Sequence, residues 1–460
     1  MGGLNTSLLI GLQALEVNQG ALDATSNNIA NVNTPGYTRE EAQLSENQQY
    51  VSGNNVTGGG VSLNAIQSIR DELLNLQIQQ QTSLQNSADA QSSSLQQIQT
   101  AFTTTGGDIA SELTAFSSSL AQLSASPTST AAQQGVIASG QDLAGAFNST
   151  ANALTSAQSQ ADGQVTQTVA QVNTLTQQIA QLNGQLAQVP AGEDGGTVED
   201  QRDQLVQQLS GLVGISITQS SDGETITTAN GSPLVMGGQS FNLQTATGSD
   251  GFQQVIDSNG NNITASIQGG TLGGVIQVRD QIVPGLLSQL NTLASQFAAA
   301  FNSAQAQGTD SNGNTGAAFF AVPSNPDDAG AAAGMAVSIT DPSQIAISSN
   351  GSVDSNGNVA NLSAALTQNL PSGQTPAGAY ASLVFQVGNA ASNASTQSSA
   401  IGQNLTQLTS QQGSVSAVSV DEETTNLLRY QTAYEAATRI VSTIQVLNNA
   451  LLNMGSTTSF

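Results

Sequence analysis

The last stretch of the chain, from about Val420 to Asn453, carries apolar side chains at a seven-residue spacing. One column contains Leu427, Tyr434 and Val441, and a second column, three positions further on, contains Tyr430, Ala437, Ile444 and Leu451. This spacing is typical of the seam of a coiled coil, so the stretch predicts a helix that needs a partner helix. About 34 residues at a rise of 1.5 Å each make a rod about 50 Å long.

The first stretch of the chain has a pattern of the same kind. A seven-residue repeat connects Leu8, Leu15, Leu22 and Ile29. It predicts a second amphipathic helix with one apolar stripe. Neither terminal helix has a globular neighbour in the sequence, so we expect the two helices to pack against each other.

The interior of the chain predicts further helices. We expect them over about 71–102, from an N-cap at Asp108 to about Ser124, over about 130–189 and over 200–213, with the first break at Gly106-Gly107. Two more seven-residue columns contain Ile276, Val283, Leu290 and Phe297, and Tyr380, Val387, Ala394, Ile401 and Leu408. Inward carboxylates and histidines are missing from these columns, which favours core packing over a cofactor site. The fold class we predict is mainly α: an elongated helical bundle and coiled coil built from both termini and the middle.

Two segments have a different pattern. Residues 37–66 indicate extended structure, with alternating apolar positions after Gly58-Gly-Gly60. Residues from Ile215 to about Ile267 form short alternating runs separated by Asn-Gly and Gly-rich turns, which predicts a small inserted antiparallel β domain.

These patterns divide the chain into five expected parts. They are an N-terminal helix with its linker over 1–60, the first part of a helical domain over 61–213, the β insertion over 214–270, the second part of the helical domain over 271–412, and the C-terminal coiled-coil helix over 413–460. The second part of the helical domain includes a loop-rich segment of Ala, Asn and Gly.

Composition limits the partners of the protein. Only 8% of residues are charged and the net charge is −25, with six basic residues that are all Arg. A chain this acidic does not favour nucleic acid or an anionic membrane surface as a partner. The apolar run from Leu8 to Leu12 is too short for a membrane span, and the N-terminus lacks the basic region of a secretory signal. We therefore expect no cleaved signal peptide.

The missing residue types also limit the chemistry. Without Cys or His the chain has no thiolate or imidazole metal ligand and no nucleophile activated by His. Carboxylate chemistry, as in glycoside hydrolysis, stays open. The repeat Asp-Ser-Asn-Gly-Asn begins at Asp257, Asp310 and Asp354 and invites a calcium interpretation, but its spacing differs from that of an EF-hand and Asn-Gly is a strong turn signal. We predict turns, and no catalytic, cofactor or metal site.

The first helix is followed by Asn27-Asn-Ile-Ala-Asn-Val-Asn-Thr-Pro-Gly-Tyr-Thr-Arg39. Local physical chemistry alone favours a helix end and a turn here. The run nevertheless resembles the signature of bacterial flagellar axial proteins, the group of rod, hook and hook-associated proteins. The extension to Arg39 and the C-terminal run from Val420 to Val441 resemble the family of hook-associated protein 1, which joins hook and filament. Interior segments agree with this family, among them 200–205, 270–280 and 310–320.

The resemblance implies a non-enzymatic structural subunit of the extracellular flagellum, exported through the flagellar type III apparatus. It implies as partners copies of the same chain, the hook protein, filament-side hook-associated subunits and an export chaperone on the C-terminal helix. The assembly interface that we predict consists of Leu8, Leu15, Leu22, Asn28, Ile29, Asn31, Asn33, Gly36, Tyr37, Leu427, Tyr430, Tyr434, Ala437, Val441, Ile444 and Leu451.

Two alternatives stay open. Another axial subunit, from the rod or the hook, shares the Asn-rich motif, although the long helical middle speaks against it. A secreted adhesin or carboxylate enzyme would use the β insertion as its working surface. An enzyme of that kind needs two facing carboxylates in an aromatic cleft, and Phe241 and Phe252 are few for a sugar site.

Overall fold

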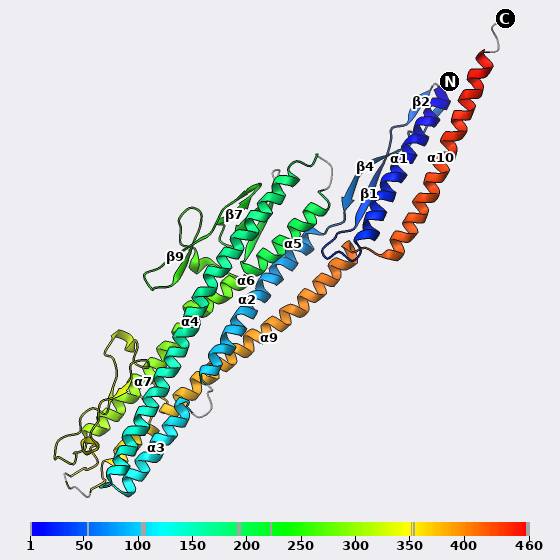
Figure 1. The fold of residues 1–460 in the computed structure, drawn as a ribbon. Coiled ribbons are helices and arrows are strands. Elements are labelled where there is room, and N and C mark those ends of the chain that lie inside the picture. The colour runs from blue at the N-terminus through cyan, green and yellow to red at the C-terminus, as the bar shows by residue number, and fades with distance from the viewer. Residues whose placement is uncertain are drawn as a thin grey trace.

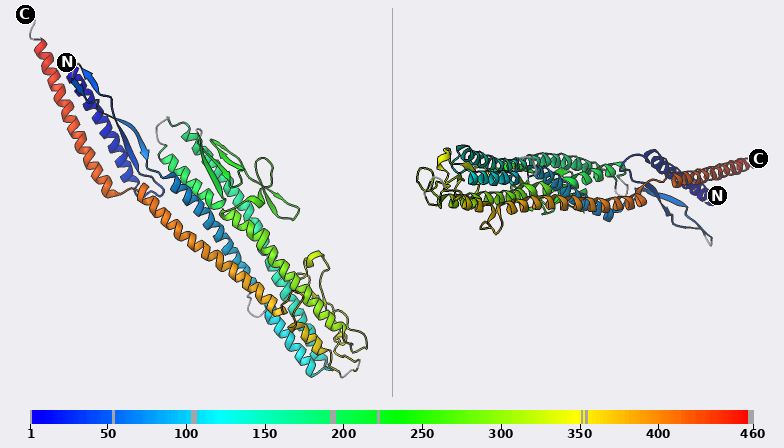
Figure 2. Two further views of the ribbon diagram at one scale, coloured as in Figure 1. Left: turned by 180° about the vertical axis from the view of Figure 1, so that it is seen from behind. Right: turned by 90° about the horizontal axis from the view of Figure 1, so that it is seen from below.

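In a computed structural model the protein is a long, thin molecule with both termini at one end (Figure 1). The structure describes residues 2–52, 55–102, 107–190, 195–220, 223–350, 352 and 355–456. Views from behind and from below show the same elongated shape (Figure 2). Helices dominate, which confirms the predicted fold class.

The end that contains both termini is a two-helix rod with a β-hairpin against it. Helix α1 (Gly2–Asn31) packs along α10 (Val420–Ser456), as the seven-residue repeats at the two ends predict. Strand β1 (Glu40–Glu46) pairs antiparallel with β4 (Val61–Ser68), and β2 (Tyr50–Ser52) pairs with β3 (Asn55–Thr57) further along the hairpin. We call the described residues of 2–68 and 420–456 the terminal rod. The expected boundary after residue 60 falls inside this hairpin, because β4 is held by β1.

The remainder of the helices form the body. Helix α2 (Glu72–Phe102) packs along α9 (Pro376–Ser416), and the long α4 (Thr130–Leu186) runs beside α3 (Ile109–Ala125) and α5 (Thr197–Leu212). Helix α6 (Gly270–Gln277) continues through a π-helical turn (Val278–Ile282) into α7 (Val283–Ala306). The predicted N-cap is confirmed, since the Asp108 side chain accepts the backbone N–H of Ser111. Gly106, part of the predicted break, lies outside the described residues.

The largest apolar core lies at the end of the body far from the termini. Helices α3, α4, α7, α8 (Val359–Thr367) and α9 contribute to it. The segment between α7 and α8 closes this end with two short paired strands, β11 (Phe320–Ala321) and β12 (Ala336–Val337), and with single 3-10 turns at Pro326–Asp328 and Pro342–Gln344. Five phenylalanine rings meet at the centre, from Phe116, Phe297, Phe301, Phe319 and Phe320.

The predicted antiparallel β insertion is confirmed and lies against α4. Its four-stranded sheet has the order β5 (Ile215–Ser220), β6 (Gly223–Thr228), β7 (Pro233–Met236) and β8 (Gln239–Ser240), and β9 (Gln244–Thr247) pairs with β10 (Gln253–Ile256). The buried side chain of Arg279 ties it to the helices: its guanidinium donates to the Asp162 carboxylate at 2.7 Å and to the Gln253 carbonyl at 2.6 Å.

Two of the Asp-Ser-Asn-Gly-Asn repeats form the same turn. In the loops that begin at Asp257 and Asp310, the aspartate Oδ1 accepts the backbone N–H groups two and four residues later, at 2.8–2.9 Å. These bonds lower the pKa of the Asp257 carboxyl. The predicted turns are therefore confirmed at these two positions, whereas Asp354 lies outside the described residues.

Candidate functional site: the terminal rod and its joint with the body

The two helices of the terminal rod approach each other through small side chains. Gly11 and Ala21 of α1 are buried, and so are Ala437, Val441 and Ile444 of α10. A Cβ atom added to Gly11 would lie 2.9 Å from Cγ2 of Val441. Small residues along the contact line bring the helix axes close together, so little apolar area is buried per residue.

The predicted columns of α10 coincide with this contact line only in part. Ala437, Val441 and Ile444 are buried, whereas Leu427 and Tyr430 are half-buried. Tyr434 is 36% exposed and Leu451 is 43% exposed. The seven-residue spacing therefore identifies the middle of the contact line, and α1 covers the side chains toward both ends of the columns only in part.

The leucine column of α1 is not its most buried line, which corrects the expectation from the sequence. Side chains of that column are half-buried, namely Leu8, Leu15, Leu22 and Ile29. The buried residues are Gly11, Val17, Ala21, Ala24, Thr25 and Asn28. The physical reason is that α1 has two neighbours, because it packs against the β1–β4 hairpin as well as α10. A Cβ atom added to Gly20 would lie 2.5 Å from a methyl group of Leu63 in β4.

A further, largely apolar column on α10 faces solvent along most of its length. It consists of the half-buried Ala433 and the exposed Ala436, Ile440, Thr443, Leu447 and Ala450, and we call it the outer column. Its spacing alternates between three and four residues, which is the a/d pattern of a coiled coil. Ile440 is 53% and Leu447 is 48% exposed. This column was not among the residues predicted from the sequence, although its spacing is visible there.

The Asn-rich motif forms the connection between α1 and the hairpin. Asn28 is 1% exposed, and its side-chain oxygen accepts both the Tyr37 hydroxyl and the Glu40 backbone N–H at 2.9 Å. Its amide nitrogen donates to the Glu40 carbonyl at 2.8 Å. One asparagine thus satisfies three polar groups and holds the end of α1 against the start of β1.

The other predicted motif residues form the turn after α1. The Asn31 side chain donates to the Asn27 carbonyl and accepts the Thr34 hydroxyl, while Asn33 is exposed. Gly36 has a φ of 79°, and a Cβ atom there would overlap the Gln204 side chain. Only glycine fits this close approach with a left-handed backbone. Burial raises the pKa of the Tyr37 hydroxyl, and the nearby acidic groups of Glu40, Asp200 and Glu423 act in the same direction.

The start of α10 meets this motif through Glu423, which is 3% exposed. The side chains of Asn28 and Thr25 and the nearby Arg39 favour the charged form of its carboxylate. Burial nevertheless raises the pKa of the Glu423 carboxyl. Arg39 itself pairs with Glu422 at 3.1 Å. The sequence pattern does not point to Glu423, Arg39 or Thr25, because nothing in it shows that α10 begins beside the end of α1.

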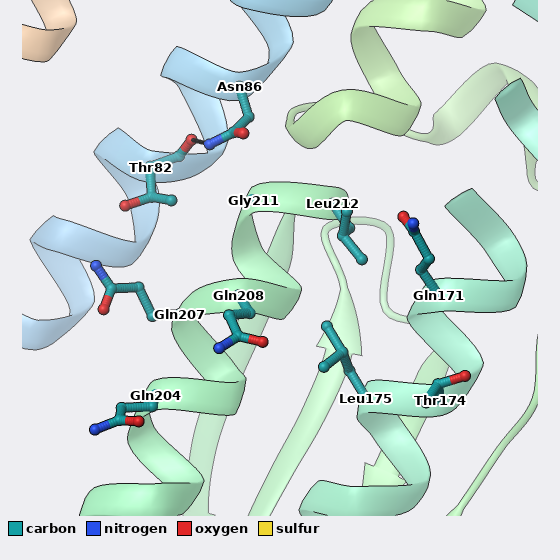
Figure 3. Close-up of a pocket in the computed structure, with 10 residues that line it drawn as sticks. All are labelled: Thr82, Asn86, Gln171, Thr174, Leu175, Gln204, Gln207, Gln208, Gly211 and Leu212. Carbon is teal, nitrogen blue, oxygen red and sulfur yellow. Dashed lines mark hydrogen bonds between the residues drawn. The ribbon is translucent and has the colours of Figure 1, made fainter. Parts of the chain in front are cut away.

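An open groove of about 640 Å³ lies in the body between α2, α4 and α5. Figure 3 shows its lining, which consists of Thr82, Asn86, Gln171, Thr174, Leu175, Gln204, Gln207, Gln208, Gly211 and Leu212. None of these lining side chains is ionisable, so they supply no general acid, general base or charged metal ligand.

The described helices do not include one long and apolar enough to span a bilayer. Among the same residues, the carboxylates do not gather into a group that could hold a metal ion.

A paired-helix rod that carries the Asn-rich motif defines a structural subunit of the flagellar axial proteins, and the comparisons with known proteins agree. Residues 8–38 match the family model for the flagella basal body rod protein, and residues 411–454 match the one for the C-terminal part of the basal body rod FlgEFG proteins. Residues 95–320 match the helical domain of flagellar hook-associated protein FlgK.

The chain is also similar to whole proteins along its length. It is 30% identical to flagellar hook-associated protein 1 of Bacillus subtilis, over 97% of this chain and 98% of that protein. It is 27% identical to the protein of the same name from Escherichia coli, over 99% of this chain and all of that protein. Its fold is similar to the solved structure of the flagellar hook junction protein FlgK from Burkholderia pseudomallei, with a TM-score of 0.67 and 19% identity over 74% of this chain and all of that one.

The chain therefore belongs to the flagellar hook-associated protein 1 family. This confirms the resemblance seen in the sequence and the class of function that it implies, a structural protein of the bacterial flagellum.

Proposed function

We propose that this chain is a non-enzymatic adaptor between hook and filament, and that it joins them through its terminal rod. The observation that carries the proposal is the incomplete burial of the rod within one chain. Large apolar side chains are exposed on both of its helices, namely Leu9, Leu12, Leu428, Ile440, Val446, Leu447, Leu451 and Leu452. A monomer rarely exposes so much apolar surface in one region unless a partner covers it.

The assembly interface predicted from sequence stays part of this proposal, with the outer column added to it. The outer column has the spacing of a coiled-coil seam, so its natural partner is another helix. We assign that partner to the terminal helix of a neighbouring subunit. The half-buried leucines of α1 and the exposed Tyr434 and Leu451 of α10 lie at the edges of the intramolecular contact, where a neighbour can complete their burial.

The proposed neighbours are copies of this chain, the hook protein and filament-side hook-associated subunits. An export chaperone is a further proposed partner on α10, since a free helix with exposed apolar side chains needs cover before assembly. A net charge of −25 continues to argue against nucleic acid and anionic membranes. The proposed location is the extracellular flagellum, reached through the flagellar type III export apparatus.

The alternative of a rod or hook subunit is weakened by the distribution of the family matches. The termini match models of basal body rod proteins, but the middle of the chain matches the helical domain of a hook-associated protein. The family matches of the terminal rod therefore favour an axial subunit in general. The family match of the body favours a subunit of the hook-filament junction in particular.

The test is a double substitution in the outer column, Ile440→Asp with Leu447→Asp, made in the full chain and introduced into a flagellated strain that lacks its own copy. Both side chains are about half exposed, so the monomer should fold normally. We expect flagella without filaments and a loss of swimming. The matched control, Thr432→Asp with Gln445→Asp, changes two exposed polar positions of the same helix by the same charge. Normal filaments with the outer-column variant would overturn the proposal.

A further inference from the structure

The terminal rod and the body are connected by two short crossings of the chain. One crossing is Ile69–Asp71, between β4 and α2, and the other is Ala417–Ser419, between α9 and α10. Each crossing contains only three residues, and a short peptide link by itself leaves the angle between two helical units free to vary. Noncovalent contacts at the crossings must therefore decide at which angle the rod leaves the body.

Arg39 lies between the two crossings and bonds to both through its backbone. Its N–H donates to the Ser416 carbonyl at 2.9 Å, at the end of α9, and its carbonyl accepts the Ile69 N–H at 2.8 Å, just before α2. Its side chain pairs with Glu422 at the start of α10. The segment at the end of the Asn-rich motif therefore contacts both crossings and the start of α10.

The body holds this segment through the first turns of α5. One carboxylate oxygen of Asp200 accepts the Thr38 N–H at 3.0 Å, and the other accepts a guanidinium N–H of Arg70 at 2.7 Å. Gln204, one turn later, donates to the Pro35 carbonyl at 2.7 Å. Asp200 is 7% exposed, so these bonds are largely shielded from water and are worth more than surface contacts.

Asp200 is the side chain that connects the motif segment and the α2 crossing at the same time. Two other acidic groups of α5 also lie at this joint: Glu199 pairs with Arg70, and Asp203 lies 3.7 Å from the same guanidinium. The first-turn position also places the Asp200 charge at the favourable end of the helix dipole of α5. Asp200 therefore carries a negative charge at the start of α5 and bonds to two different partners.

We infer that Asp200 is a positioning residue that fixes the angle between the terminal rod and the body, because its one carboxylate hydrogen-bonds to both the Thr38 backbone and the Arg70 side chain. The inference goes beyond the proposed function, because it concerns the free chain and does not depend on which subunit the rod contacts. When Asp200 is lost, the rod stays helical and attached, and its direction becomes variable.

Spin-label distance measurements on the full chain test this inference. The sequence has no cysteine, so labels attach only where cysteines are introduced. We choose the exposed positions Gln19 in α1 and Thr406 in α9, one on each side of the joint. In the labelled parent chain we expect one narrow distance distribution.

Asp200→Ala should at least double the width of that distribution, while the helix content and the unfolding midpoint of the body stay within error. The matched control is Glu199→Ala, which removes a neighbouring carboxylate from Arg70 but leaves the Thr38 contact in place, and it should keep the narrow distribution. An unchanged width in the Asp200 variant, or equal broadening in both variants, would overturn the inference. If Asp200→Ala does not fold, the isosteric Asp200→Asn takes its place, with the same criteria.

Discussion

The far end of the body and the terminal rod show two different ways to build a helical unit from a chain with few aromatic residues. At the far end of the body, Phe301 lies within 5.1–6.2 Å of the rings of Phe116, Phe297, Phe319 and Phe320, and all five are at most 1% exposed. In the described part of the terminal rod no phenylalanine is present, and the buried line consists largely of Gly, Ala and Val.

The stability of the free molecule resides mainly in the far end of the body. Each fully buried aromatic side chain removes a large apolar area from water, so the far end of the body can stabilise itself. The contact between α1 and α10 buries small side chains and leaves leucine and isoleucine exposed. The packing of the rod is therefore incomplete within one chain, and neighbouring subunits can complete it on assembly.

The largest expected effect comes from breaking the aromatic centre of the body. Phe301→Ala leaves a cavity among four other rings and should lower the free energy of unfolding by about 3–5 kcal/mol, measured by urea denaturation. The control is Phe385→Ala in α9, whose side chain is 68% exposed and should change stability by less than about 0.5 kcal/mol. Equal effects of the two substitutions would contradict the proposed location of the core.

The second prediction breaks the rod and leaves the body intact. Val441→Asp places a carboxylate in the contact between α1 and α10, where Val441 is 8% exposed, and should cost about 3 kcal/mol of rod stability. Hydrogen exchange of α1 and α10 amides should become fast while α4 and α7 stay protected. Val446→Asp on the same helix, at a position 65% exposed, should leave the exchange of the monomer unchanged. Faster exchange throughout the chain would mean that rod and body are one cooperative unit.

A smaller effect is expected at the connection between α1 and the hairpin. Asn28→Ala removes the hydrogen bonds that Asn28 makes with the Tyr37 hydroxyl and with both backbone groups of Glu40, at an expected cost of about 2 kcal/mol to the rod. Limited proteolysis should then cut residues 32–39 before any site in the body. Asn33→Ala, in the same motif but exposed, is the control and should not alter the cleavage pattern.

The smallest effect concerns pH. The pKa of Tyr37 is raised above its ordinary value of 10.0, so the folded state keeps the proton while the unfolded state loses it. The contribution of this group is complete below pH 10 and declines as pH rises above 10. Because Tyr37 is partly exposed, solvent screening reduces the expected decline to a few tenths of a kcal/mol per pH unit. The difference in stability between the parent chain and Tyr37→Phe, followed from pH 9 to 11, should show this slope.

Local sequence pattern predicts the helices of the body better than the contacts of the terminal rod. The helices of the body begin and end close to where caps, prolines and heptads place them, and the β insertion follows the Asn-Gly turns. The leucine column of α1 does not coincide with the buried line of this helix. The reason is that α1 packs against the hairpin as well as α10, and a single repeat does not reveal two neighbours. The outer column of α10 was equally visible in the sequence, but only the structure shows that it stays uncovered.

By itself the sequence determined the helical class, the position of the β insertion, the pairing of the two ends and the family, since these depend on periodicity and on contiguous motifs. The contacts at the joint between rod and body depend on the tertiary structure alone. The bonds from Asp200 to Thr38 and to Arg70 span 162 and 130 residues, so they depend on how whole helices are placed. In the sequence, Asp200 is one acidic residue in the first turn of a helix. It becomes the link between rod and body only because the fold brings two distant segments, at Thr38 and Arg70, to the same carboxylate.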